Sequence, residues 1–254
     1  MPERLPSLSF FFPAYNEESN VEAVVDEALA KLPRFADDFE VVVIDDGSSD
    51  RTPQIADALA ARHPNVRVIH HMPNRGYGGA VRSGLRSATK DFVFFTDGDR
   101  QFDLDDLARL LPALASPSAG KAGPAGSEDG ADVVIGYRLK RRDPAHRLFV
   151  AWVYNMLISA LFLGRFRDVD CAFKLFRRSV FDRVPLERVR SNGAFFSPEL
   201  LITLGRAGVR MSQVGVPHYP RTADEAKGAT PKVILRAIRD LLLLRLRLWF
   251  GRSE

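Results

Sequence analysis

Two aspartates, Asp97 and Asp99, follow an apolar run that begins at Phe92, and only Gly98 separates them. The run is rich in β-forming residues, which predicts a buried strand ending at the two acids. Ligands bind at strand ends in open α/β sheets, and two carboxylates around a glycine can reach one hard cation. Solvated turns closed by an Asx hydrogen bond use the same spacing. The position after a buried strand favours a metal site that holds a diphosphate.

A second acid pair, Asp45 and Asp46, ends the continuous apolar run at residues 39–44. Such a run is typical of a central parallel strand covered on both faces. A third strand is predicted at residues 66–70, before the glycine-rich segment 74–79. His70 and His71 close that strand without metal-ligand spacing to a third donor, and we interpret them as structural.

Helical patterns alternate with these strands. The first strand is predicted at residues 7–12, and Asn16 is expected to cap a helix that reaches about residue 32. Further helices are predicted at residues 53–62 and from the glycine-rich segment to residue 88. Four strands and three helices within the first hundred residues predict an α/β fold, with a Rossmann-like, mostly parallel sheet covered by helices. The acidic and glycine-rich strand ends then meet at one edge.

The second half of the chain is more basic. Residues 116–131 are rich in glycine, alanine, serine and proline, which predicts a flexible surface loop. A strand is expected at 132–136, followed by a basic run and then by the uncharged segment 148–164, which we interpret as a buried or interfacial helix rather than a membrane span. A turn into a strand is expected at 168–176 and a helix at 198–207. We assign residues 1–230 to one catalytic domain.

Residues 231–254 are predicted to form a basic amphipathic helix. This tail is leucine-rich, and its arginines include Arg236, Arg239, Arg245 and Arg247. The pattern suits an anionic membrane surface, and the alternative is a helix that packs on its own domain or on a second subunit. The expectation is a peripheral membrane protein that relies on its tail, on a membrane-protein partner or on homo-oligomerisation.

Composition excludes several classes of protein. The 254 residues are 46% hydrophobic with a formal net charge of +4, as expected of a globular protein with a full core. The single cysteine, Cys171, excludes an internal disulfide and a zinc site built from several thiolates. The first residues lack a secretion signal, so the cytoplasm is expected. Nucleic-acid binding is not expected, because leucines rather than stacking aromatics interrupt the basic stretches.

The ordered motifs resemble those of the family-2 glycosyltransferases with the GT-A fold, and among them the dolichyl-phosphate mannose synthase-like group. The motifs are PAYNEE at 13–18, VVVIDDGSSDRT at 41–52, NRGYGGAVRSGLRSA at 74–88, FFTDGDRQFD at 94–103, IGYR at 135–138, DCAFKLFRR at 170–178 and HYPRTADEAKG at 218–228. Together they cover nearly the whole chain, and their order is highly specific.

The resemblance implies a set of site residues. Those expected to hold the base and ribose of a nucleotide sugar are Pro13, Tyr15, Glu17, Ile44 and Asp46. Those expected to meet the diphosphate and its metal are Asp97, Gly98, Asp99 and Gln101. Arg221 and Lys227 match a segment that closes over the donor phosphates in the family. This sequence departs from that segment at Asp224 and Ala226, which replace a glycine and a serine.

The implied reaction is transfer of a sugar, with inversion, from GDP-mannose or a UDP-hexose to a polyprenyl phosphate such as a dolichyl or undecaprenyl phosphate. A divalent cation would neutralise the departing diphosphate, and the residue types fit Mg²⁺ and Mn²⁺ equally. A lipid phosphate is already anionic, so it needs positive charge rather than a base. Arg138, helped by a neighbour among Lys140, Arg141 and Arg142, is the candidate.

Three alternatives remain open. A sugar hydroxyl acceptor, as in cell-envelope glycan synthesis, would need a carboxylate base, for which Asp168 and Asp170 are the nearest candidates. A sugar-nucleotide pyrophosphorylase would be expected to carry a glycine-rich, arginine-containing loop where this chain has the acidic PAYNEE. A phospho-acceptor signalling domain would be about half this length.

Overall fold

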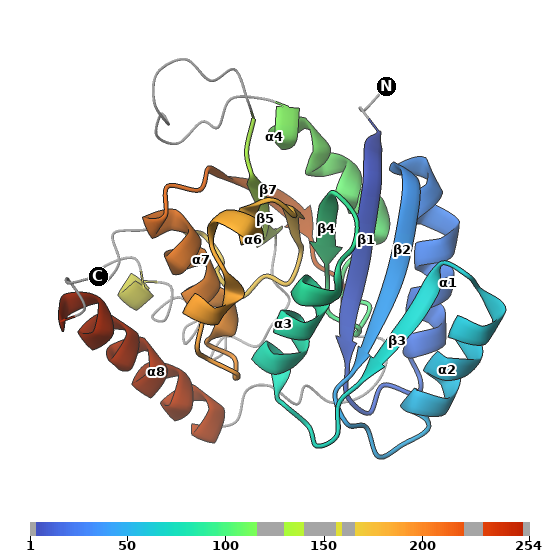
Figure 1. The fold of residues 1–254 in the computed structure, drawn as a ribbon, viewed down its shortest axis with the longest axis horizontal. Coiled ribbons are helices and arrows are strands. Elements are labelled where there is room, and N and C mark those ends of the chain that lie inside the picture. Colours follow the sequence, from blue (N-terminus) through green and yellow to red (C-terminus); the bar gives the residue numbers. More distant parts are fainter. Residues whose placement is uncertain (1–3, 116–129, 140–155, 159–165, 221–230, 251–254) are drawn as a thin grey trace.

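The computed structural model describes residues 4–115, 130–139, 156–158, 166–220 and 231–250. These residues form one seven-stranded sheet with the strand order β3-β2-β1-β4-β6-β5-β7 (Figure 1). The strands are β1 (Leu5–Ala14), β2 (Ala36–Asp45), β3 (Val66–His70), β4 (Phe92–Phe95), β5 (Val133–Leu139), β6 (Lys174–Arg177) and β7 (Met211–Pro217).

The helices connect and cover these strands. The α-helices are α1 (Val21–Lys31), α2 (Thr52–Arg62), α3 (Tyr77–Ser87), α4 (Leu111–Ala115), α6 (Val180–Arg183), α7 (Phe196–Arg206) and α8 (Pro231–Phe250). The 3₁₀ helices are η1 (Leu32–Arg34), η2 (Leu104–Arg109) and η3 (Leu186–Arg188). The prediction of an α/β fold is confirmed.

The first four strands are all parallel. β1 lies between β2 and β4, and β3 pairs with β2. The chain therefore leaves β1 toward one side and later returns to its other side, which creates a topological switch point next to the end of β1. Beyond β4 the sheet is mixed, because β6 runs antiparallel to both β4 and β5, whereas β7 is parallel to β5. The sequence pattern did not predict β7 or the direction of β6.

Successive side chains of each strand point to opposite faces of the sheet and pack into two separate cores. Phe10 and Phe12 of β1 pack with α1, α2 and the η2–α4 region, whereas Phe11 packs with α3 and α7 on the opposite face. Phenylalanines tie neighbouring strands together on both faces: the Phe10 and Phe94 rings lie 5.5 Å apart, and those of Phe11 and Phe95 lie 5.2 Å apart. These aromatic pairs add cross-strand stabilisation where the site will be built.

The expected helix start at Asn16 is wrong. Asn16 has a positive φ of 53°, and its side-chain oxygen accepts a hydrogen bond from the Ser49 backbone at 2.8 Å. Helix α1 begins only at Val21, after a turn in which the Glu17 carbonyl accepts from the amides of Asn20 and Val21. Asn16 therefore joins the ends of β1 and β2 instead of capping a helix.

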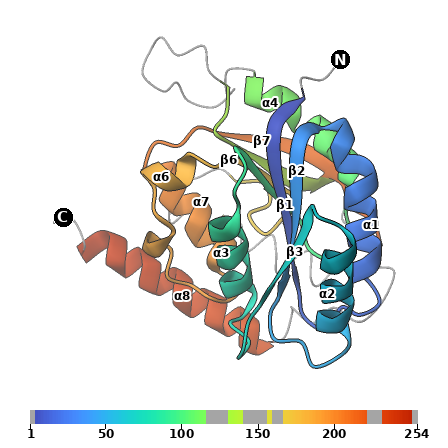
Figure 2. The same ribbon diagram turned by 45° about the vertical axis from the view of Figure 1, so that its right-hand side comes forward.

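Helix α8 packs on the domain through one face, and several of its leucines remain exposed to solvent. Its inner face, which includes Ala237, Leu241 and Leu244, belongs to the core around α3 and α7. The helix runs beside α7 in both views (Figures 1 and 2). The predicted tail helix is thus confirmed, together with the alternative that it packs on its own domain. The exposed leucines are Leu242, Leu243 and Leu246.

No helix in the described ranges is both long and apolar enough to span a membrane. The segment 148–164 lies outside those ranges except for residues 156–158, and nearly all of the predicted loop at 116–131 does so as well.

Buried Glu40 on β2 joins the turn before β4 to the sheet. Its carboxylate accepts hydrogen bonds from Ser9 Oγ at 2.5 Å, from Thr89 N at 2.9 Å and from Arg67 Nε at 2.7 Å. Burial acts to raise the pKa of Glu40, but these hydrogen bonds outweigh it and lower the pKa from 4.5 to about 2. The charged carboxylate is therefore the form that stabilises the folded state.

Glu40→Gln should lower the free energy of unfolding at pH 7 by about 2 kcal/mol, because the depressed pKa is lost with the charge. In the wild-type protein this contribution is complete above about pH 4.5 and disappears as the pH falls toward 2. Urea unfolding across that range measures it. The matched control is Glu22→Gln, which removes only an exposed ion pair with Arg62 and should change stability by less than about 0.5 kcal/mol. Equal losses in both variants would contradict the assignment.

Candidate active site

Three strand ends meet at one edge of the sheet. The register pairs Pro13 with Ile44 and Ala14 with Asp45, and β4 runs parallel on the other side of β1. Asp46 N also donates to the Ala14 carbonyl at 2.9 Å. The segments that follow β1, β2 and β4 therefore lie next to one another at the switch point, as the sequence predicted.

Gly98 allows the turn after β4 to approach β1 closely. A Cβ at this position would lie 3.0 Å from both Phe12 Cδ2 and the Pro13 carbonyl oxygen. A larger residue would push the turn away from β1. The glycine between Asp97 and Asp99 thus favours close packing, and it brings both acids close to the end of β1.

Asp97 is set up to receive a cation. Its Oδ1 atom is buried and has no hydrogen-bond partner among the residues that the structure describes. Burial and the neighbouring Asp99 charge raise the pKa of Asp97 from 3.8 to about 7, against the opposing effects of a hydrogen bond from Tyr77 and the charges of Lys174 and Arg138. A buried carboxylate oxygen without a partner is costly, and a positive ligand would remove that cost.

Asp99 and Gln101 connect the acid pair to the end of β7. Asp99 is buried, and its Oδ1 accepts a hydrogen bond from Gln101 N at 3.2 Å. The Gln101 side chain donates to the Tyr219 carbonyl at 3.2 Å, while Tyr219 N donates to the Gln101 carbonyl at 2.9 Å. The Gln101 amide nitrogen is thus used within the protein, which leaves its side-chain oxygen as the atom that can face a metal.

The acid pair fits a divalent cation of the Mg²⁺ or Mn²⁺ type. Asp97 and Asp99 provide hard oxygen donors, and Gln101 can add an amide oxygen. Within the described part of the chain no group of three or more His, Cys, Asp or Glu side chains could hold a metal by itself. A site with two carboxylates suits a cation that takes its remaining ligands from phosphates and water.

Arg138 and Asp168 form a buried, two-point ion pair. The Nε and Nη2 atoms of Arg138 on β5 donate to the two Asp168 carboxylate oxygens at 2.6 and 2.8 Å. Burial alone would lower the pKa of Arg138, but Asp168 outweighs it and raises the pKa above its usual value. The sequence suggested separate roles for these residues, one as a phosphate binder and one as a candidate base. The structure joins them, so the Asp168 carboxylate is already occupied.

Lys174 is a buried cation that the sequence analysis missed. Its side chain is 0% exposed, its ammonium group donates to the Cys171 carbonyl, and it lies 5.5 Å from the centre of the Phe95 ring. Burial lowers the pKa of Lys174, while the charges of nearby acids, including Asp170 and Asp97, act against that shift. Fully buried lysines are rare. The signal was present in the sequence, because this lysine interrupts an otherwise apolar strand.

The residues predicted to hold the nucleotide lie along the ends of β1 and β2. Tyr15 is 45% exposed, and Pro13 is partly buried. The buried Glu17 carboxylate accepts from Asn20 Nδ2 at 2.7 Å. Ile44 has a fully buried side chain, so its backbone alone can meet a ligand. Asp46 is buried at the end of β2.

Several predicted residues cannot be placed. Arg221 and Lys227, expected over the donor phosphates, lie outside the described ranges, and so do Lys140, Arg141 and Arg142. Their roles stay predictions.

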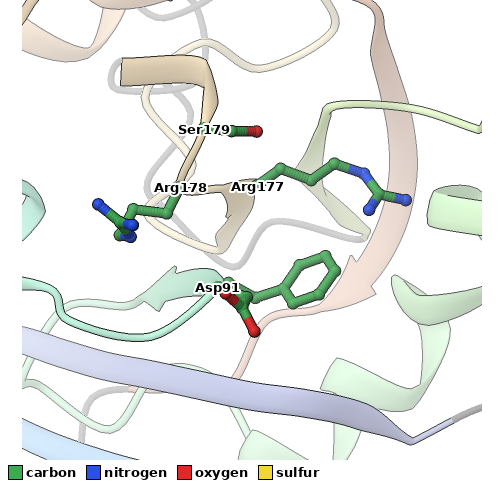
Figure 3. A pocket seen from close by; sticks show the side chains of 5 residues that line it. Asp91, Arg177, Arg178 and Ser179 are labelled. Carbon is green, nitrogen blue, oxygen red and sulfur yellow. The ribbon is translucent and has the colours of Figure 1, made fainter. Parts of the chain in front are cut away.

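A small surface hollow of about 170 Å³ lies at the opposite edge of the sheet, between the start of β4 and the end of β6. Arg177 and Arg178 line it but extend in different directions, with Asp91 between them (Figure 3). Arg177 donates to the Leu114 carbonyl at 3.2 Å. These arginines do not converge on one point, and they lie at the start of β4, whereas the acid pair follows its end.

Cation binding at the acid pair should depend on pH. Asp97 has a raised pKa of about 7, so below that pH its carboxyl group is protonated and must release the proton before it binds a metal. The affinity for Mn²⁺ should fall by up to about tenfold per pH unit below pH 7 and level off above it. Calorimetric titrations at several pH values measure this. Asp99→Asn should bind Mn²⁺ weakly at every pH, and a wild-type affinity that does not change between pH 6 and 8 would contradict the site.

Comparison with known proteins supplies the family. Residues 9–184 match the model of the family described as glycosyl transferase family 2. The glycosyltransferase AglD of Haloferax volcanii is 32% identical over 245 residues, which cover 96% of this chain and 37% of that protein. A dolichyl-phosphate beta-glucosyltransferase of Drosophila melanogaster is 32% identical over 228 residues, which cover 82% of this chain and 66% of that protein. The chain thus spans between about a third and two thirds of these curated relatives.

A similar fold occurs in a solved structure. Glucosyl-3-phosphoglycerate synthase from Mycobacterium tuberculosis, crystallised with Mn²⁺, UDP and glucosyl-3-phosphoglycerate, superposes with a TM-score of 0.64 at 21% identity. The match covers 98% of this chain and 81% of that chain. The family model matches well over half of the sequence, and the sheet and its helices agree with this neighbour. The chain belongs to glycosyl transferase family 2 and adopts the GT-A fold.

Proposed function

We propose that this protein transfers a sugar, with inversion, from a nucleoside-diphosphate sugar to a polyprenyl phosphate at the cytosolic face of a membrane, and that the transfer requires Mg²⁺ or Mn²⁺. The observation that carries the proposal is the acid pair at the switch point, where Asp97 Oδ1 lies buried next to Asp99 and no described residue hydrogen-bonds to it. A bridged cation and diphosphate would satisfy both acids.

The donor side is supported by the order of groups along the sheet edge. The ends of β1 and β2, with Tyr15 and Asp46, lie beside the turn that carries Asp97 and Asp99. A nucleoside lying across the first two strand ends would place its diphosphate at the acid pair. The solved neighbour of the same fold holds Mn²⁺ and UDP. The proposed donors are GDP-mannose or a UDP-hexose.

The acceptor side favours an anion over a hydroxyl group. A hydroxyl acceptor needs a carboxylate base, and Asp168 is held by Arg138 at 2.6 and 2.8 Å. A phosphate monoester needs no base, and positive charge is available from Arg138, whose Nη1 atom is outside the Asp168 pair. The Drosophila relative is named for transfer to dolichyl phosphate. A hydroxyl acceptor in cell-envelope glycan synthesis remains the second candidate, with the exposed Asp170 as its base.

The proposed mechanism assigns a separate task to each group. An oxygen of the acceptor phosphate attacks the anomeric carbon from the face opposite the diphosphate, and the bond to the leaving diphosphate breaks. A divalent cation held by Asp97 and Asp99 would neutralise the charge that develops on the leaving group. Arg138 orients the acceptor phosphate, and Asp168 holds the Arg138 side chain in place. Arg221 and Lys227 are proposed to close over the donor phosphates.

Helix α8 is the proposed contact with the membrane. Leu242, Leu243 and Leu246 are 52%, 41% and 47% exposed, and exposed arginines, among them Arg239 and Arg245, accompany them. Exposed leucines among arginines suit the headgroup region of an anionic bilayer.

The transfer reaction is tested with a panel of radiolabelled UDP- and GDP-sugars, a short polyprenyl phosphate and Mg²⁺ or Mn²⁺. Label should appear in the organic phase, disappear with EDTA and fall at least about a hundredfold in Asp99→Ala, because the leaving group loses its stabilisation. Asp170→Asn should retain transfer within about tenfold, because the phosphate needs no base. A loss of about a hundredfold or more in Asp170→Asn, or label only in water-soluble product, would replace the lipid phosphate with a hydroxyl acceptor.

Membrane binding is tested by flotation with vesicles. Vesicles that contain anionic lipid should carry the wild-type protein, and a variant with Leu242, Leu243 and Leu246 changed to Ser should remain unbound, because its apolar contact with the bilayer is lost. The control is a Leu29→Ser change on α1, where a partly buried residue lies away from α8. Equal flotation of the wild-type protein and the triple variant would exclude α8 as the contact.

A further inference from the structure

Two adjacent histidines pair with two adjacent aspartates at the ends of β3 and β2. The strand register sets His70 opposite Asp45, and His71 N donates to the Asp45 carbonyl at 2.9 Å. The His70 ring then meets the Asp45 carboxylate, and the His71 ring meets that of Asp46. The sequence alone suggested only that these histidines are structural. The two pairs differ in a way that gives them different roles.

The His71 ring links α3 to Asp46. It is 1% exposed, its Nδ1 lies 2.6 Å from Asp46 Oδ1, and its Nε2 lies 2.8 Å from Ser83 Oγ on α3. A carboxylate only accepts hydrogen bonds, so the ring carries a proton on Nδ1 and donates it to Asp46. In the neutral ring Nε2 then accepts from the Ser83 hydroxyl. The donor and acceptor roles of the two ring nitrogens are therefore fixed by their partners, and the ring has one orientation.

Among the described residues, those that hydrogen-bond to the Asp46 carboxylate use one of its two oxygens. Its Oδ1 accepts from the His71 ring and from Arg75 N at 2.8 Å, and its carbonyl accepts from Asn74 Nδ2 at 2.6 Å. The described residues thus donate hydrogen bonds to Oδ1 and to the carbonyl oxygen of Asp46. These bonds leave Oδ2 available to a ligand. The carboxylate is buried, so a defined orientation of Oδ2 matters for any group that binds it.

The His70–Asp45 pair offers no such free oxygen. Asp45 Oδ2 lies 2.8 Å from His70 Nδ1, and Asp45 Oδ1 accepts from Ser48 N at 3.0 Å. The His70 side chain is 37% exposed, and its other nitrogen meets Asp57 at 3.0 Å. One Asp45 oxygen thus holds the loop after β2, and the other meets the histidine at the end of β3. The His70–Asp45 pair therefore has a structural role, whereas the His71–Asp46 pair leaves Asp46 Oδ2 available to a ligand.

We propose that His71 is a positioning residue for the nucleotide of the donor: it fixes the Asp46 carboxylate so that Oδ2 accepts a hydrogen bond from the base or ribose of a nucleoside diphosphate. This inference rests on the proposed function, because it deepens the role given there to Asp46. A carboxylate held before the ligand arrives loses less freedom on binding, and this raises affinity without any new contact. Ser83 acts one step further back, by orienting the ring.

The test uses calorimetric binding of UDP and GDP in the presence of Mn²⁺. His71→Phe keeps the ring volume and removes both hydrogen bonds, and it should weaken nucleotide binding by about tenfold or more. His71→Asn keeps a donor near the position of Nδ1 and should bind within about threefold of wild type. His70→Phe is the matched control on the adjacent pair and should leave nucleotide affinity unchanged. Thermal unfolding of every variant identifies any that fail to fold.

A double-mutant cycle with Asp46→Ala separates positioning from general stability. In that background His71→Phe should cause no further loss of nucleotide affinity, because the group through which it acts is absent. With an active donor, His71→Phe should raise KM for the nucleotide sugar and leave kcat nearly unchanged, as expected for contacts made equally in the ground and transition states. If His71→Phe does not fold, Ser83→Ala takes its place with an expected loss of about threefold.

Wild-type nucleotide affinity in folded His71→Phe would overturn the positioning role, and so would additive effects of the two substitutions or a loss as large in His70→Phe. The proposed function fails separately, if wild-type protein binds neither UDP nor GDP with Mn²⁺ present. In that case the role of His71 in donor binding fails with it.

Discussion

The parallel register of β1 with β2 and β4 is the constraint on which the rest of this structure depends. It carries three chain segments to the same edge, where Asp46 N bonds to the Ala14 carbonyl and the turn at Gly98 approaches Pro13. A slip of one residue would turn the phenylalanines of β1 to the wrong core and move the acids with them. The aromatic pairs across the strands oppose such a slip, so the packing of the core also determines the geometry of the site.

The site concentrates charge in a poorly hydrated region and offsets it locally. The buried Lys174 interacts electrostatically with Asp97, and Arg138 is paired with Asp168. Buried charges of opposite sign reduce the cost of burying each other, although they rarely make a protein more stable than an apolar core would. This arrangement fits the proposed binding of a diphosphate and a cation better than it fits a contribution to folding stability.

The sequence predicted the strands that end in acids and the helices between them, because apolar runs, glycines and acidic ends are local signals. It missed features that depend on distant partners. Arg138 and Asp168 are separated by 30 residues in the sequence, and His71 and Asp46 by 25 residues. No local pattern predicts either pair. The prediction that Asn16 caps a helix is wrong because an asparagine side chain can equally accept a hydrogen bond from a neighbouring loop, here from Ser49. The strand β7 is mostly only partly buried, so its apolar signal is weak.

The two hydrogen bonds between Gln101 and Tyr219 couple the end of β7 to the turn after β4. They anchor the chain where it leaves β7, beside the acid pair, so that residue 220 starts from a defined point whatever follows it. A change at Tyr219 can therefore reach Asp99 through Gln101, although the two residues lie on segments far apart in the sequence.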